Sequence, residues 1–100
     1  MPVNSRLKNE TVDEFFKAIL ALKTNQECYR FFEDVCTVKE IQEMALRWAV
    51  ARKLATGATY QAVVEETGAS TATVARVKKY LDYGADGYKL MLRRLGISKK

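Results

Sequence analysis

The stretch from Thr59 to Leu81, TYQAVVEETGASTATVARVKKYL, gathers the side chains with the clearest chemistry in this 100-residue chain. Its second half interleaves threonine hydroxyls and small alanines with three cations, Arg76, Lys78 and Lys79. Alanine lets a helix backbone approach a base edge closely, hydroxyls exchange hydrogen bonds with bases and phosphates, and cations attract phosphate. These residue types favour contact with nucleic acid.

The apolar residues of the same stretch predict two helices joined by a tight turn. Thr59 opens the first helix, Gly68 permits the left-handed backbone of the turn, and Ser70 or Thr71 caps the second helix. The positions expected to face the core are Val63, Val64, Val74, Val77 and Leu81. The outer face of the second helix then carries Ala72, Ala75, Arg76, Lys79 and Tyr83. This arrangement has helix-turn-helix form, with the second helix as a recognition helix.

The charge distribution supports the same interpretation. Residues 1–43 carry 6 basic and 8 acidic side chains, whereas residues 44–100 carry 11 and 4, so the balance changes from −2 to +7. A one-sided basic half suits a phosphate-binding surface, with solvated lysines as the alternative interpretation. Arg93, Arg94, Lys99 and Lys100 are candidates for contacts with flanking phosphates.

Catalysis is disfavoured by what the chain lacks. It contains no histidine, which removes the commonest general base and a frequent metal ligand, so we expect neither an enzyme nor a metal site. Asp82 and Asp86 are spaced as a carboxylate pair, but they flank Gly84 and are better interpreted as turn and cap residues. Cys28 and Cys36 are eight residues apart in a predicted helix, about 12 Å along its axis and beyond disulfide reach. We expect two buried thiols in a reducing compartment.

The elements that position these residues all show helical spacing, so we predict an all-α fold in a single domain spanning residues 1–100. No run is long enough for a membrane span and the first residues do not form a signal peptide, so we expect a cytoplasmic protein. Thr24-Asn25-Gln26-Glu27 and Thr37-Val38-Lys39-Glu40 have capping-box form. The helix that ends at Gly57 is apolar on two sides and is expected to be a central strut. The six predicted helices cover residues 10–23, 24–36, 37–57, 60–66, 71–83 and 85–95, followed by a frayed basic end at 97–100.

Residues 37–95 resemble the tryptophan repressor superfamily. The run TGASTATVARV, followed by YLDYGADGYKLML, is similar to the YerC/YecD-like group of that superfamily. The resemblance implies an intertwined homodimer with residues 10–56 as dimerisation helices, residues 59–83 as the helix-turn-helix and residues 85–95 as the C-terminal helix. A dimer would account for the number of aromatic side chains, although a single-chain core is the other interpretation. These side chains are Phe15, Phe16, Phe31, Phe32 and Trp48.

The resemblance also implies roles for individual residues. Base-facing family positions fall on Thr71, Ala72 and Ala75, which agrees with the outer face. Two arginines of the family's tryptophan pocket match Arg47 and Arg76, but Val77 replaces the glycine that makes room for the indole ring. This argues against tryptophan as the effector and leaves open a corepressor of another chemistry. Basic positions in the first helix of the motif are Gln61 and Val64 here. For Arg47 the preferred interpretation is a surface or interhelical salt bridge, for instance with Glu43.

We therefore predict a homodimeric, sequence-specific DNA-binding transcriptional regulator, a repressor, that recognises a pseudo-palindromic operator in double-stranded DNA. The alternative is a helical protein–protein interaction or dimerisation module without specific DNA binding. Non-specific RNA binding has less support because no basic and aromatic residues interleave on a flat platform. The predicted DNA-contacting residues are Gln61, Ser70, Thr71, Ala72, Thr73, Ala75, Arg76 and Lys79.

Overall fold

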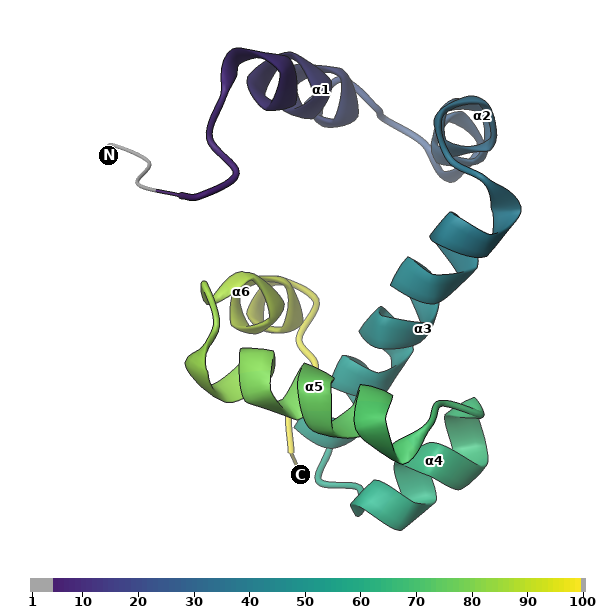
Figure 1. Cartoon of the computed structure of the whole chain (residues 1–100), viewed down its shortest axis with the longest axis vertical. Helices are drawn as coiled ribbons and strands as arrows, with labels where there is room; N and C mark the ends of the chain where they lie inside the picture. The colour runs from purple at the N-terminus through teal and green to yellow at the C-terminus, as the bar shows by residue number, and fades with distance from the viewer. Residues whose placement is uncertain (1–4, 100) are drawn as a thin grey trace. The chain divides into compact units, whose positions relative to one another are not determined.

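The computed structural model describes residues 5–99 and shows six α-helices and no strand over that range (Figure 1). The predicted all-α fold class is therefore confirmed. Contacts divide the chain into two compact units, which meet in sequence between Thr37 and Val38. None of the described helices is long and apolar enough to cross a membrane. The helices are α1 (Glu10–Leu20), α2 (Asn25–Val35), α3 (Val38–Ala55), α4 (Tyr60–Thr67), α5 (Thr71–Tyr83) and α6 (Gly87–Arg94).

The first unit holds α1 and α2. Asn9 caps α1 by accepting a hydrogen bond from the Val12 N–H at 2.8 Å. Phe15 of α1 stacks on Phe31 of α2 with ring centroids 5.9 Å apart, so aromatic contact joins the two helices. Helix α1 ends at Leu20, three residues before the predicted end, because the chain must become extended at Thr24 to cap the next helix.

The capping box predicted at the start of α2 forms with one difference. The Thr24 hydroxyl accepts the Glu27 N–H at 3.1 Å, as expected. The Glu27 carboxylate accepts the N–H of Lys23 at 2.8 Å, one residue before the cap. The pair still satisfies two backbone donors at the helix start, which stabilises α2 where the sequence placed it.

Neither helix of the first unit contains a buried residue. Large apolar side chains are left in water, with exposed fractions of 84% for Leu20, 67% for Tyr29 and 46% for Phe16. The prediction of two buried thiols is wrong, since Cys28 is exposed and Cys36 is only partly covered. The helical pattern correctly marked an apolar face, but nothing in the chain's own described surface covers that face completely.

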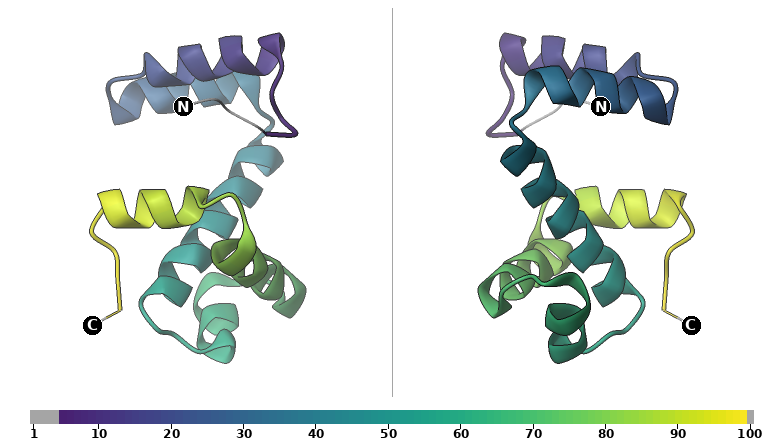
Figure 2. Two further views of the ribbon diagram at one scale, coloured as in Figure 1. Left: turned by 90° about the vertical axis from the view of Figure 1, so that its left-hand side faces the viewer. Right: turned by 90° about the vertical axis from the view of Figure 1, so that its right-hand side faces the viewer.

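The second unit is built around α3, against which α4, α5 and α6 all pack (Figures 1 and 2). Its core is a cluster of small apolar side chains from four segments: Val50, Ala51, Val63, Ala69, Val74 and Val77, each at most 2% exposed. Leu46, Trp48 and Leu54 of α3 pack partly buried against this cluster. Before that point α3 leaves apolar side chains exposed, with Val38 at 71% and Met44 at 40%. The second half of α3 is thus the part that anchors the helices after it.

The chain after α6 is not a frayed end as far as the structure describes it. Gly96 takes a left-handed conformation and the N–H of Ile97 donates to the Leu92 carbonyl at 2.9 Å, a pairing that closes the helix. Ile97 is then half-buried and lines a hollow with Arg52 and Thr56 of the α3 end. The apolar Ile97 side chain explains the difference, because covering it offsets the loss of chain freedom. Lys100 lies outside the described residues.

Candidate nucleic-acid interface

The Thr59 cap and the left-handed Gly68 that the sequence predicts for α4 and the turn after it are both present. The Thr59 hydroxyl caps α4 by accepting the Ala62 N–H at 3.1 Å, and Gly68 ends the helix at φ 78°, a left-handed conformation that glycine adopts without a side-chain clash. Within the turn, the Thr67 hydroxyl donates to the Val63 carbonyl at 2.6 Å and accepts the Ala69 N–H at 3.1 Å. These bonds make the turn a defined structure.

Helix α5 is capped by Ser70 and not by Thr71. The Ser70 hydroxyl accepts the Thr73 N–H at 3.0 Å and donates to the Thr73 hydroxyl at 3.0 Å. Thr73 is partly buried in this arrangement, whereas Thr71 is exposed as the first residue of the helix. Ser70 and Thr73 therefore secure the helix start, and Thr71 presents the free hydroxyl.

The cap makes a specific prediction. Replacing Ser70 by alanine removes the acceptor of the Thr73 N–H, so we expect a loss of about 1 kcal/mol in the free energy of unfolding. Thermal unfolding followed by circular dichroism at one fixed protein concentration measures this change. Thr71→Ala is the matched control, one residue away with no role in the cap, and we expect it to unfold at nearly the wild-type temperature. Equal loss in both variants would contradict the assignment of the cap to Ser70.

The inner face of α5 is anchored in the core as predicted. Val74 and Val77 are 0% and 1% exposed and Leu81 is 8% exposed, and Val63 of α4 is fully buried. Val64 is only partly buried. Because α5 is held along its inner face, its opposite face is presented in one orientation to the solvent.

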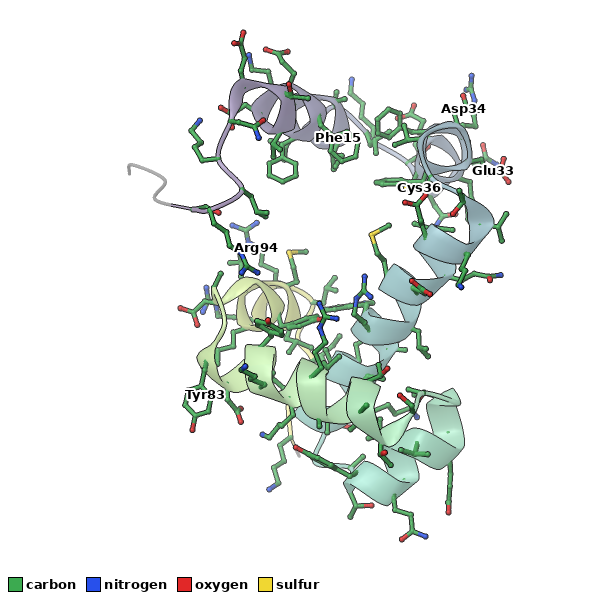
Figure 3. The ribbon with its side chains drawn as sticks, viewed as in Figure 1. Phe15, Glu33, Asp34, Cys36, Tyr83 and Arg94 are labelled. Carbon is green, nitrogen blue, oxygen red and sulfur yellow. The ribbon has the colours of Figure 1, made fainter. Side chains whose placement is uncertain are left out.

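That opposite face carries four of the eight predicted contact residues. Ala72, Ala75, Arg76 and Lys79 are all exposed, and Tyr83 projects from the end of α5 with 87% of its surface accessible (Figure 3). Gln61 is exposed on α4, where its amide donates to Glu65 at 3.3 Å. The structure thus brings the small and the cationic residues of α5 together on one face and places Gln61 on the preceding helix.

The cations of this face differ from their neighbours in having no acidic partner. Lys78 is paired with Asp82 at 3.2 Å, and Lys53 of α3 is paired with Glu66 of α4 at 3.0 Å. Arg76 and Lys79 make no ion pair with any residue in the described range 5–99. Their charge is therefore available to a phosphate or a base. Arg93, Arg94 and Lys99 are exposed as well.

Sequence reasoning missed Tyr80, which the structure places beside both free cations. The Arg76 guanidinium and the Lys79 ammonium each lie 5.9 Å from the centroid of the Tyr80 ring. The spacing of Arg76 and Tyr80, four residues apart on a helix, was the available signal, because side chains at i and i+4 are neighbours.

The two residues predicted to line an effector pocket, Arg47 and Arg76, do not line a common hollow in the described structure. Arg47 is half-buried on α3 and forms no ion pair with Glu43 or with any other residue in the range 5–99, so the preferred interpretation of Arg47 as a salt-bridge residue is wrong. Because the Glu43 carboxylate is exposed, an ion pair with it gains little in water, which explains its absence. Residues close to these two in sequence line a hollow of about 430 Å³, but neither Arg47 nor Arg76 lines it. It is lined by Trp48, Tyr80, Ala85, Gly87, Tyr88 and Met91, with the Trp48 and Tyr88 rings nearly parallel at 6.4 Å.

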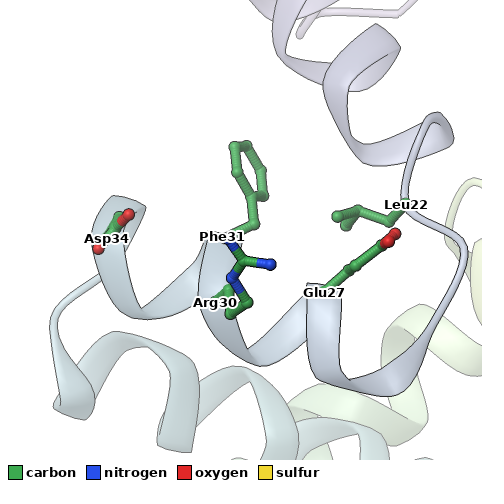
Figure 4. A pocket seen from close by; sticks show the side chains of 5 residues that line it. All are labelled: Leu22, Glu27, Arg30, Phe31 and Asp34. Atoms are coloured by element: carbon green, nitrogen blue, oxygen red, sulfur yellow. The ribbon is translucent and has the colours of Figure 1, made fainter.

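A second hollow, of about 360 Å³, lies on the first unit along α2 and is polar (Figure 4). Arg30 lies there between the acidic Glu27 and Asp34, with Leu22 and Phe31 beside them. Because the Glu27 carboxylate already accepts the Lys23 N–H, part of this lining serves the start of α2. Nowhere in residues 5–99 do three side chains of His, Cys, Asp or Glu come together as a metal site would require.

Asp82 and Asp86 do not form an acid-base couple. Asp82 lies inside α5, paired with Lys78, so the interpretation of Asp82 as a turn residue is wrong. Asp86 occupies the cap position before α6 in a left-handed conformation at φ 65°, but its side chain makes no capping hydrogen bond. Helix α5 continues past Asp82 because Leu81 is still buried and holds that turn against the core.

Taken together, the capped α4–turn–α5 unit and its basic outer face define the helix-turn-helix class of DNA-binding fold. The family model described as Trp repressor protein matches residues 10–96. The chain belongs to the Trp repressor family, and its fold is that of a DNA-binding regulator.

Individual relatives agree with this assignment. The uncharacterised protein YerC of Bacillus subtilis strain 168 is 51% identical over 90 residues, which cover 90% of this chain and 86% of YerC. The crystal structure of a candidate Trp repressor from Staphylococcus aureus matches with a TM-score of 0.90 and 45% identity over 95% of each chain. A TrpR-like protein from Eubacterium eligens ATCC 27750 matches with a TM-score of 0.91 and 48% identity, over 97% of this chain and all of that one.

Proposed function

We propose that the protein is a homodimeric, sequence-specific DNA-binding transcriptional regulator, a repressor, acting on a pseudo-palindromic operator. The observation that carries the proposal is the outer face of α5, where Arg76 and Lys79 lack acidic partners and lie beside small residues. A helix presenting free cations and little bulk fits the major groove and its flanking phosphates. The membership of the Trp repressor family supports the same conclusion.

Each contact residue has a distinct task in this proposal. Ala72 and Ala75 allow the helix backbone to approach the base edges, and the Thr71 hydroxyl is free to bond a base or a phosphate. Arg76 and Lys79 supply the electrostatic attraction, which makes the binding salt-dependent because each neutralised phosphate releases a counterion. Gln61, exposed at the start of α4, would contact the DNA backbone in this proposal.

The homodimer is supported by the first unit taken by itself. Isolated helices shorter than about 12 to 15 residues are marginal in water, and α1 and α2 have 11 residues each and bury none of them. Their exposed apolar side chains need a cover, and a second copy of the chain supplies one of matching composition. Two recognition helices about 34 Å apart would then enter successive major grooves.

Tryptophan is not part of the proposal. Val77, at the position of the family's pocket glycine, is 1% exposed and packs in the core cluster, so its isopropyl group fills space there. A corepressor of another chemistry is compatible with the partly accessible Arg47 and the exposed Arg76. Titrating amino acids and metabolites while following Trp48 fluorescence tests for one, since Trp48 is partly exposed and lines the aromatic hollow.

Selection of operators from random duplexes at physiological salt tests the proposed function. We expect enrichment of a pseudo-palindrome whose half-sites are about 10 base pairs apart, centre to centre. The proposal fails if no sequence is enriched and no duplex binds more tightly than the roughly 10⁻⁴ to 10⁻⁶ M of non-specific association.

The second candidate function is a helical interaction module that binds a protein partner without specific DNA recognition. The exposed apolar side chains of α1 and α2, Leu20 and Tyr29 in particular, favour it. If the protein is such a module, the charges of Arg76 and Lys79 would be irrelevant to its binding of the protein partner. Charge reversal at these two positions therefore separates the candidates.

A further inference from the structure

We propose that Tyr80 is a positioning residue that holds Arg76 and Lys79 in place on the recognition helix for DNA. The inference rests on the proposed function. Its basis is the geometry of three side chains, in which both cationic groups lie 5.9 Å from the centroid of the same ring. That distance is within the range of cation–π attraction.

The position of Tyr80 on α5 suits this role. At 100° per residue, Tyr80 lies between the outer face, which includes Arg76, and the buried face, which includes Val77. The surroundings of Tyr80 agree with this position. Its side chain is 40% exposed, and it also lines the aromatic hollow with Trp48, Tyr88 and Met91. The ring thus meets both the aromatic hollow and the two cations.

An aromatic ring holds a cation without cancelling its charge. Lys78, the third cation of α5, is held by the Asp82 carboxylate at 3.2 Å, and that carboxylate would repel an approaching phosphate. The Tyr80 ring attracts cations through its quadrupole and carries no net charge. Arg76 and Lys79 therefore keep their full attraction for phosphate while their side chains are restrained.

The restraint lowers the cost of binding. A free arginine or lysine side chain loses rotamer freedom when it docks on DNA, and each ordered side chain weakens binding by about two- to tenfold. Two cations that are already ordered by one ring avoid part of that loss. Removing the ring is expected to weaken binding by about 5- to 30-fold.

The experiment measures the affinity of the full-length protein for the duplex enriched by operator selection, at several salt concentrations. For Tyr80→Ala and Tyr80→Leu we expect the same loss at every salt concentration, because all phosphate-contacting charges remain. Tyr80→Leu keeps apolar bulk in the hollow, so it gives a folded variant if the alanine variant unfolds. Tyr80→Phe, which keeps the ring, is expected to bind like the wild type. Tyr88→Leu is the matched control, because Tyr88 lines the same hollow as Tyr80 but touches neither cation, and we expect it to bind like the wild type.

Double substitution separates positioning from other effects. In an Arg76→Ala, Lys79→Ala background, Tyr80→Leu is expected to cause little further loss, because the cations through which Tyr80 acts are gone. The inference is overturned if Tyr80→Leu binds like the wild type, if its loss is equally large in that background, or if Tyr80→Phe does not restore binding. A wild-type protein that binds no duplex overturns the proposed function and this role with it. A wild-type protein that binds while Tyr80→Leu is unchanged overturns this role alone.

Discussion

Reversing both free cations of α5, Arg76→Glu with Lys79→Glu, is expected to abolish specific DNA binding. Both residues are exposed and neither is paired with an acid in the part of the chain that the structure describes. The substitution exchanges two attractions for two repulsions in each protomer, so we expect affinity to fall by more than about 100-fold. The salt dependence of the residual binding should also become weaker, because fewer cations contact phosphates. Fluorescence anisotropy of a labelled operator duplex measures both quantities.

The control must change the net charge equally without touching the recognition helix. Lys39→Glu with Arg52→Glu does so, since both residues are exposed and lie on α3 in the second unit. We expect this variant to lose far less affinity. Equal losses in the two double variants would mean that net charge and not the outer face of α5 attracts DNA. An unaffected Arg76→Glu, Lys79→Glu variant would favour the interaction module.

Placing a charge on the apolar face of α1, Phe16→Asp, is expected to convert the proposed homodimer to a monomer and to remove specific DNA binding. Phe16 is 46% exposed in the single chain, although its ring contacts Phe15 at a centroid distance of 6.2 Å. Burying an unpaired carboxylate at a subunit interface costs several kcal/mol, which a dimer of two small chains cannot offset. Sedimentation at micromolar concentration should show the 11.4 kDa species instead of twice that mass.

Ala18→Asp is the matched control for this prediction. Ala18 is exposed on the same helix, 200° from Phe16 around the axis, and so lies away from the apolar face. We expect the Ala18→Asp variant to remain dimeric and to bind the operator. A wild-type protein that sediments as a monomer at micromolar concentration would contradict the homodimer directly. A dimeric Phe16→Asp variant would place the interface elsewhere.

Local signals in the sequence were enough to predict the helices. Thr24, Thr59 and Ser70 cap helices at or next to the predicted positions, and Gly68 provides the turn, because caps and left-handed glycines act within a few residues of the chain. The alternation of core and outer positions on α5 was also predicted correctly, since helical periodicity orders side chains around a helix axis.

Burial in the first unit could not be predicted in the same way. Cys28 and Cys36 lie in an aromatic helix, which suggested a core, but the described surface leaves the first exposed and the second half-covered. Periodicity identifies the side chains that need to leave water. It does not say whether the cover comes from the same chain, because that depends on surfaces distant in sequence.

Part of the candidate site could likewise be predicted from the sequence, and part could not. The outer face of α5, with Ala72, Ala75, Arg76 and Lys79, was predicted from spacing alone and is exposed as expected. The contact of Tyr80 with both cations was missed, because which rotamers long side chains adopt is decided by their surroundings. The expected ion pair of Arg47 with Glu43 does not form. A spacing that permits the pair does not make it stable, because the Glu43 carboxylate is exposed to water.

The sequence by itself determined the all-α fold, the helix-turn-helix and the face of α5 that meets solvent, because these follow from interactions within one or two helical turns. Only the tertiary structure decided which groups from distant segments meet. It placed Trp48 of α3 against Tyr88 of α6, returned Ile97 to the end of α3, and left Arg76 and Lys79 free while pairing Lys53 with Glu66. Such contacts depend on how whole helices pack, and packing is a property of all the surfaces at once.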